Sequence, residues 1–131
     1  MRFKTNFLGA LLFLFVVGAF SIAFAEYEKI VVAAEAADRQ AAISEVAGRA
    51  NYFLFFNGEG SFLEAVKNPF LSLRGGAGPK VAEFLVKNGA VHVVAGKFGY
   101  KMEQALSSFN VVHTQQTGIS SDAVQALLKT Q

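Results

Sequence analysis

The stretch GGAGPKVAEFLVKNGAVHVVAG, residues 75–96, decides the fold of this chain. The apolar residues of its first half recur at helical spacing on one face: Val81, Ala82, Leu85 and Val86. Pro79 suits the first position of a helix, and Asn88-Gly89 suits the end of one. Val91–Ala95 is a β-branched run of the kind that forms a buried strand. The stretch therefore predicts a helix over 79–88 followed directly by a strand.

Upstream of this stretch, the sequence predicts strands joined by a hairpin. Lys29–Ala34 and the aromatic-rich Asn51–Phe56 both read as strands, and Asn57–Gly60 supplies residues that tolerate a tight turn. Ser61–Lys67 fits a returning third strand or a helical turn, and residues 35–44 fit a loop or a short helical turn. We expect the aromatic residues of the second strand to lie in the core: Tyr52, Phe53, Phe55 and Phe56.

Downstream, strand and helix alternate. Gly96–Gly99 reads as a tight loop, Tyr100–Ser108 as a second helix and Val111-Val112 as a short fifth strand. Ser120 or Ser121 is expected to cap a last helix that runs through Leu128. The order predicts an α/β fold with a mixed five-stranded sheet and helices on its faces. In such sheets ligands bind beyond the carboxyl ends of the parallel strands, which here are Ala34-Glu35, the Gly96–Gly99 loop and His113.

The first 25 residues have the pattern of an export signal. Arg2 and Lys4 precede the apolar run Phe7–Phe20, and Ala23-Phe24-Ala25 is a small-x-small site for cleavage before Glu26. An uncleaved anchor is the alternative, since the apolar segment approaches the length that spans a bilayer. We expect cleavage after Ala25, a mature domain of residues 26–131 in the periplasm or otherwise outside the cytoplasm, and membrane contact only through the signal segment.

Charge and cysteine content exclude several classes of function. The chain has 12 basic and 10 acidic residues, and since Arg2 and Lys4 belong to the signal segment, the mature domain has 12 − 2 = 10 of each. A neutral domain gives no reason to expect nucleic acid, whose binding needs a basic face. The chain has no cysteine, so thiolate chemistry, disulfides and all-cysteine metal sites are excluded.

Three segments of the mature domain resemble the dinitrogenase iron-molybdenum cofactor biosynthesis family, which includes NifX- and NafY-type proteins and the carboxy-terminal part of NifB. The first is Gly75–Lys80 (GGAGPK) with its amphipathic helix, Asn88-Gly89 and the strand to Gly96, with another glycine at Gly99. The second, Ile43–Phe53 (ISEVAGRANYF), resembles the family's Ser-Glu-His-Phe-Gly-Arg-Ala-Pro-Tyr-Phe. The third, Lys67–Pro69, resembles its Glu-Asn-Pro.

This resemblance implies a ribonuclease-H-like fold and a role in binding or carrying iron-molybdenum-sulfur clusters or their precursors. Two features depart from the family. Val46 replaces the family's histidine, with Ala47 in place of its phenylalanine, which removes an imidazole that could ligate a soft metal. The export signal also separates this chain from cytoplasmic nitrogenase assembly.

The glycine loop is the main candidate site. Metal-sulfur clusters, thiomolybdates and molybdate are anions, and consecutive backbone N–H groups at a helix N-terminus bind anions. Gly75, Gly76 and Gly78, with Ala77 among them, allow close approach. Cations flank the loop at Arg74 and Lys80, and each would contribute about 0.5–1 kcal/mol. The neighbouring loop adds its own candidates: Gly96, Lys97 and Gly99.

Three further side chains each have a functional and a structural interpretation. His113, near the predicted ligand end, could supply one metal ligand or be a loop histidine, and His92 fits a hydrogen-bonded histidine inside a strand. Arg49 follows Gly48 as in the family's Gly-Arg pair and could contact the anion or form a surface salt bridge.

Enzyme functions find no support in the sequence. A ribonuclease-H nuclease needs carboxylates on its first and fourth strands to hold two metal ions, and Val31–Ala34 and Val91–Ala95 carry none. The chain also lacks a Gly-x-Ser-x-Gly nucleophile elbow. We therefore expect a non-enzymatic carrier of an anionic metal-sulfur cluster or molybdenum-type oxyanion. The alternative is a ligand-free module that docks an envelope protein through a sheet edge or aromatic surface, and a homodimer fits either case.

Overall fold

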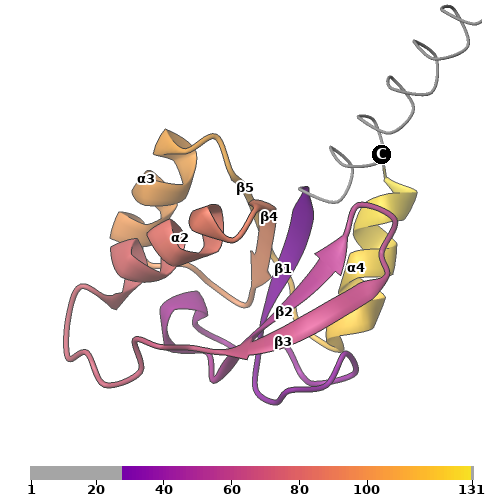
Figure 1. Cartoon of the computed structure of the whole chain (residues 1–131), viewed down its shortest axis with the longest axis horizontal. Coiled ribbons are helices and arrows are strands. Elements are labelled where there is room, and N and C mark those ends of the chain that lie inside the picture. Colours follow the sequence, from indigo (N-terminus) through magenta and orange to yellow (C-terminus); the bar gives the residue numbers. More distant parts are fainter. Residues whose placement is uncertain (1–27, 131) are drawn as a thin grey trace, which may run out of the picture.

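The computed structural model describes residues 28–130, which form a five-stranded sheet with helices on both faces (Figure 1). The elements in chain order are β1 (Lys29–Ala34), the 3₁₀ turn η1 (Ala47–Arg49), β2 (Tyr52–Asn57), β3 (Phe62–Lys67), α2 (Ala77–Lys87), β4 (Ala90–Ala95), α3 (Tyr100–Ser108), β5 (Val112–Gln115) and α4 (Ser120–Lys129).

The sheet has the strand order β3-β2-β1-β4-β5. Strands β1, β2 and β3 form an antiparallel meander, while β4 runs parallel to β1 and β5 runs parallel to β4. Val31 at the centre of β1 pairs with Phe55 on one side and Val93 on the other. The mixed five-stranded α/β sheet that the sequence predicted is therefore confirmed.

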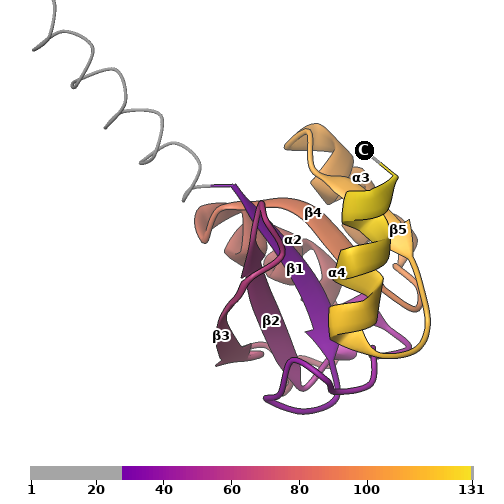
Figure 2. The same ribbon diagram turned by 90° about the vertical axis from the view of Figure 1, so that its right-hand side faces the viewer.

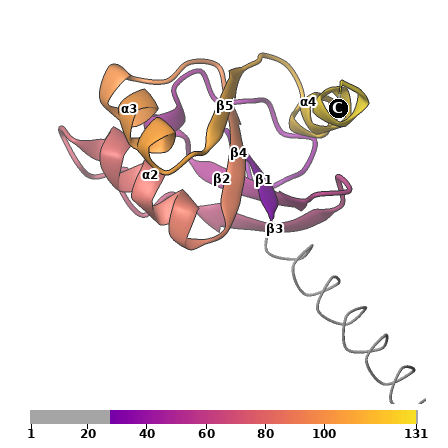
Figure 3. The same ribbon diagram turned by 90° about the horizontal axis from the view of Figure 1, so that it is seen from above.

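Alternation along the central strands divides the core into two layers. Val31 and Val93 face α2 and α3, and Val32 and Val94 face α4. Helices α2 and α3 therefore cover one face of the sheet, and α4 covers the other, as the view from above shows (Figure 3). From the side, α4 lies next to β1 (Figure 2). Phe53, Phe55 and Phe56 are buried as predicted, and Tyr52 is half-buried.

Two open alternatives are resolved. Ser61–Lys67 contributes β3 rather than a helical turn, and Asn57–Gly60 is the hairpin turn, with Gly60 at φ +90°. Residues 35–44 form turns. Two isolated bridges hold them in place, one between Ala34 and Ile43 and the other between Ala42 and Ile119.

Three expected boundaries are wrong. Helix α2 begins at Ala77, so Pro79 is its third residue, a position that still needs no N–H donor. Strand β5 begins at Val112 and includes His113, which therefore lies within the strand and not after it. Neither Ser120 nor Ser121 caps α4, whose N-cap is Ile119. The Ser120 hydroxyl instead donates to the carbonyl of Ala41 at 2.7 Å.

The predicted signal segment, residues 1–25, lies outside the described residues. Within residues 28–130, no helix has the length and apolar character needed to cross a bilayer.

Candidate functional site

Three segments meet near the carboxyl end of β4, where the sequence placed the site. Val46, just before η1, forms a parallel bridge with Lys97, and the amide of Ala47 donates to the Lys97 carbonyl at 3.0 Å. Gly48 in η1 is buried against the start of α2: a Cβ on it would lie 3.5 Å from the Cα of Gly78. The glycine loop before α2 and the Gly96–Gly99 loop are thus joined through η1.

The N-terminus of α2 presents backbone amides without acceptors. Gly76, its N-cap, has φ +72° and ψ 14°, and helical Ala77 follows it, so successive N–H groups can converge on one anion. Among the described residues, no carbonyl or side chain accepts a hydrogen bond from the amides of Gly75, Gly76, Ala77 or Gly78. Gly75 and Gly76 are exposed. The amides of Gly75 and Gly76 are therefore open to a ligand, whereas Ala77 is buried and Gly78 is half-buried.

The first turn of α3 lies beside this loop. A Cβ on Gly78 would lie 3.0 Å from the Cβ of Met102 and 3.5 Å from its amide nitrogen. Within the described chain, the amides of Tyr100, Lys101 and Met102 also have no acceptor. Two helix N-termini, each with a partial positive charge, are therefore adjacent.

Helix α4 begins differently. Its first two amides, from Ser120 and Ser121, donate to the carbonyls of Ala41 and Arg39 at 3.0 and 2.9 Å. Loop carbonyls therefore accept hydrogen bonds from the first amides of α4, whereas the first amides of α2 and α3 have no such acceptors among the described residues.

The predicted cations divide into two groups. Arg74 and Lys80 are exposed on either side of the glycine loop. Lys97 forms an ion pair with Glu45 at 3.5 Å, which places a carboxylate beside that cation. Arg49 directs its guanidinium at the loop itself and donates to the carbonyls of Leu73 and Arg74.

The glycines of the two loops have different steric roles. A Cβ on Gly96 would lie 2.7 Å from the carbonyl oxygen and 2.8 Å from the Cα of Glu45, so this position requires glycine for packing. Nothing lies within 4 Å of a Cβ built on Gly75, Gly76 or Gly99. These three face open space, where a ligand could approach.

The two histidines lie in neighbouring strands, His92 in β4 and His113 in β5. His113 is partly buried in β5, with its ring 5.1 Å from that of Phe98, and His92 lies 2.7 Å from the Thr114 hydroxyl. Burial lowers the pKa of His92, and the proximity of His113 lowers it further. The part of the chain that the structure describes holds no group of three His, Asp or Glu side chains that could bind a metal ion.

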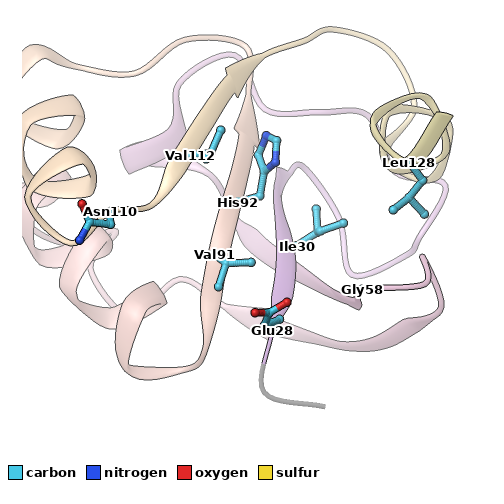
Figure 4. Close-up of a pocket in the computed structure, with 8 residues that line it drawn as sticks. All are labelled: Glu28, Ile30, Gly58, Val91, His92, Asn110, Val112 and Leu128. Carbon is cyan, nitrogen blue, oxygen red and sulfur yellow. The ribbon is translucent and has the colours of Figure 1, made fainter. Parts of the chain in front are cut away.

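His92 also lines a shallow hollow of about 360 Å³, which opens beside the amino end of β4 (Figure 4). Apolar side chains from β1, β4, β5 and α4 form much of its wall: Ile30, Val91, Val112 and Leu128. The hollow lies apart from the glycine loop and shares no residue with it.

Two parts of the site were missed by sequence reasoning. The amides of α3 were not considered, although Gly99 before a predicted helix was a signal for them. Asn68 entered the sequence analysis only within Lys67–Pro69, without a role of its own. Its buried side chain donates to the carbonyls of Gly48 and Ala50 and accepts from the amide of Phe70.

Comparison with known proteins connects this geometry to a family. The family model described as dinitrogenase iron-molybdenum cofactor matches residues 28–130. The apo form of the orange protein from Desulfovibrio gigas is 30% identical, with a TM-score of 0.74 over 79% of this chain and 88% of that one.

More distant solved structures share the fold. A putative NifB protein from Thermotoga is 24% identical, with a TM-score of 0.66 over 77% of this chain and 87% of that one. A putative dinitrogenase from Methanocaldococcus jannaschii is 10% identical, with a TM-score of 0.53 over 78% and 88%. Among curated proteins, no significant match to the sequence was found.

Proposed function

This chain belongs to the dinitrogenase iron-molybdenum cofactor family, and on that premise we propose that it is an exported, non-enzymatic carrier of an anionic metal-sulfur species. The cargo is a molybdenum- or iron-containing sulfide cluster, a thiomolybdate or molybdate. The observation that carries the proposal is the run of backbone amides without acceptors at Gly75–Gly78.

The available donors suit a whole anion better than a bare metal ion. The chain has no cysteine, Val46 stands where the family has histidine, and the described residues hold no three-ligand cluster. Backbone amides and exposed cations can instead bind the outer sulfur or oxygen atoms of a preformed anion. Arg74 and Lys80 flank the loop, and neither forms an ion pair with a described residue. Lys80 nevertheless lies near enough to Glu83 to add to the effect of Lys87, which lowers the pKa of that carboxyl.

The adjacent start of α3 favours a cargo larger than a single oxyanion. The amides of Tyr100–Met102 adjoin those of the glycine loop through the contact between Gly78 and Met102. An extended anion could contact both sets, whereas molybdate is small enough for one. We therefore expect a polynuclear cluster to bind more tightly than either mononuclear anion, molybdate or tetrathiomolybdate, with dissociation constants of the order of micromolar.

Export is part of the proposal and follows from the pattern of residues 1–25. Expression of the full-length chain in a bacterial host tests it, because the intact mass of the protein recovered from the periplasm shows whether cleavage has occurred after Ala25. A protein that stays in the membrane fraction with residues 1–25 attached would refute the cleaved form.

The cargo is tested with a matched pair of variants. Gly75→Asp places a negative charge at the glycine loop, and Gly58→Asp makes the same change at the hairpin between β2 and β3, distant from that loop (Figure 1). Both positions have open space for a side chain. The purified proteins are offered tetrathiomolybdate or molybdate under anaerobic conditions, and bound metal is measured after dialysis together with visible absorbance.

We expect Gly75→Asp to weaken tetrathiomolybdate binding at least tenfold, about 1.4 kcal/mol, and Gly58→Asp to match the wild type. Equal binding by both variants would move the cargo away from the loop. No binding by the wild type would favour the alternative of a protein-interaction module. That alternative draws on the exposed apolar side chains near the β5 edge, Phe109 at 47% and Val112 at 57% exposure, which a partner protein or a second copy could cover.

A further inference from the structure

We propose that Arg49 is a positioning residue that orients the amides of Arg74 and Gly75 at the start of the glycine loop, and not a direct contact to the anion. This inference rests on the proposed function, because it assigns a role toward the same cargo. It differs from the sequence-based expectation for Arg49, which placed its charge against the anion or in a surface salt bridge.

The first step is the hydrogen bonding of the guanidinium. One terminal nitrogen of Arg49 donates to the carbonyl of Leu73, and the other donates to the carbonyl of Arg74 at 3.2 Å. Consecutive carbonyls are therefore held by one planar group with a fixed fork of donors. Neither of the two described ion pairs includes Arg49, so its guanidinium binds the loop backbone and no carboxylate.

The second step is the geometry of the peptide unit. In a trans peptide the carbonyl of one residue and the N–H of the next point in opposite directions, and no described peptide bond is cis. A carbonyl of Leu73 turned toward Arg49 thus turns the N–H of Arg74 away from it. In the same way, the bonded carbonyl of Arg74 directs the N–H of Gly75 away from Arg49.

The third step is the removal of competing negative charge. A carbonyl oxygen carries partial negative charge and would repel an anion at the loop. Because Arg49 binds two such oxygens, the N–H groups of these peptide units are the groups that face the cargo. Without the guanidinium, the flexible Gly75-Gly76 pair has no side chain to restrict how its peptide planes turn.

The loop is held at its other end by a second side chain. The amide group of buried Asn68 donates to the carbonyls of Gly48 and Ala50 at 3.3 and 2.9 Å, on either side of Arg49. The amide of Phe70 donates to the Asn68 oxygen at 2.9 Å. Residues 68–74 are therefore tied to the η1 segment at both ends, and Arg49 forms the tie next to the glycines.

Arg49→Lys and Arg49→Gln, compared in the protein that is recovered after expression of the full-length chain, test this role. Lysine keeps the positive charge but cannot bridge two carbonyls as the planar fork does, and glutamine removes the charge. Arg39→Gln, an exposed arginine on the α4 side of the molecule, is the matched control. The measurements are backbone ¹⁵N order parameters of residues 73–77 without anion, thermal stability, and affinity for tetrathiomolybdate.

We expect order parameters for Arg74–Gly76 to fall from about 0.85 to below about 0.6 in both Arg49 variants. The melting temperature should fall moderately, because each lost hydrogen bond contributes about 0.5–1.5 kcal/mol. Affinity should fall about five- to thirtyfold in both, the loss expected when one backbone residue must be ordered on binding. Arg39→Gln should match the wild type in every measurement.

Two results would overturn the inference. If Arg49→Lys keeps wild-type affinity while Arg49→Gln loses it, Arg49 acts as a charge at the anion. If the loop stays ordered in both variants, the guanidinium does not position it. A wild type that binds no tetrathiomolybdate would refute the cargo proposal instead, and the order parameters would still decide whether Arg49 holds the loop.

Discussion

Gly96→Ala provides the sharpest test of the site's construction, because it separates a packing role from a binding role. The added methyl would lie 2.7 Å from the carbonyl oxygen of Glu45, 2.8 Å from its Cα and 3.1 Å from its carbonyl carbon. Favourable contacts between such atoms lie near 3.5–4.0 Å. All three obstructing atoms are backbone atoms, so no side chain can rotate away and the segment around Glu45 must move.

The displacement would strain two hydrogen bonds, from the Gly96 amide to the Ser44 carbonyl at 2.8 Å and from the Ala47 amide to the Lys97 carbonyl at 3.0 Å. Overpacking costs about 1–3 kcal/mol, and each weakened hydrogen bond adds about 0.5–1 kcal/mol. We expect a loss of about 2–5 kcal/mol, which lowers the melting temperature of a domain this size by at least about 8 °C.

Circular dichroism during thermal and urea unfolding measures this loss. Gly99→Ala is the control in the same loop: its Cβ would meet nothing within 4 Å, and its φ of −72° suits any residue. It should leave the melting temperature within about 2 °C of the wild type. A Gly96→Ala protein as stable as Gly99→Ala would refute the close approach to Glu45, and with it the junction of η1 and the Gly96–Gly99 loop.

Two further predictions concern stability. Burial lowers the pKa of His92 from 6.5, so the unfolded chain binds the proton more readily than the folded one. The stability that His92 contributes is therefore fully present above pH 6.5 and is lost as pH drops through the folded-state pKa. In urea unfolding, His92→Gln should show a smaller difference in stability between pH 8 and pH 5, and an unchanged difference would contradict this assignment. Ser120→Ala removes the buried hydroxyl bond to Ala41 and should cost about 1 kcal/mol in urea unfolding, whereas Ser121→Ala should change stability by less than about 0.5 kcal/mol, and equal losses would refute the role of that bond.

Much of the fold follows from local patterns. The helical spacing of Val81 and Leu85 and the β-branched strand after Asn88-Gly89 place α2 and β4 correctly, because both patterns report burial on a definite face. The predicted start of α2 at Pro79 is wrong by two residues, because the proline indicated the first turn and not the first residue of the helix. Gly76 ends the loop through its left-handed backbone, and Pro79 is tolerated anywhere in the first turn.

The site was predictable only in part. Glycines before a helix indicated free amides at α2, but residues far apart in sequence decide which cations remain free. Lys97 pairs with Glu45 and Arg49 binds the carbonyls of Leu73 and Arg74, and neither pairing leaves a signal in the sequence. His113 was misplaced because two valines defined too short a strand, whereas parallel pairing with β4 continues through Gln115.

The different starts of the three helices have a consequence for attempts to make this protein more heat-resistant. The backbone at Gly99 has the extended geometry of an ordinary N-cap, so serine or aspartate there could close the first turn of α3 and raise stability by a few tenths of a kcal/mol. The same oxygen would occupy the amides that we assign to the cargo. Laboratory evolution that selects for thermostability alone should therefore favour variants that are more stable but no longer bind the anion.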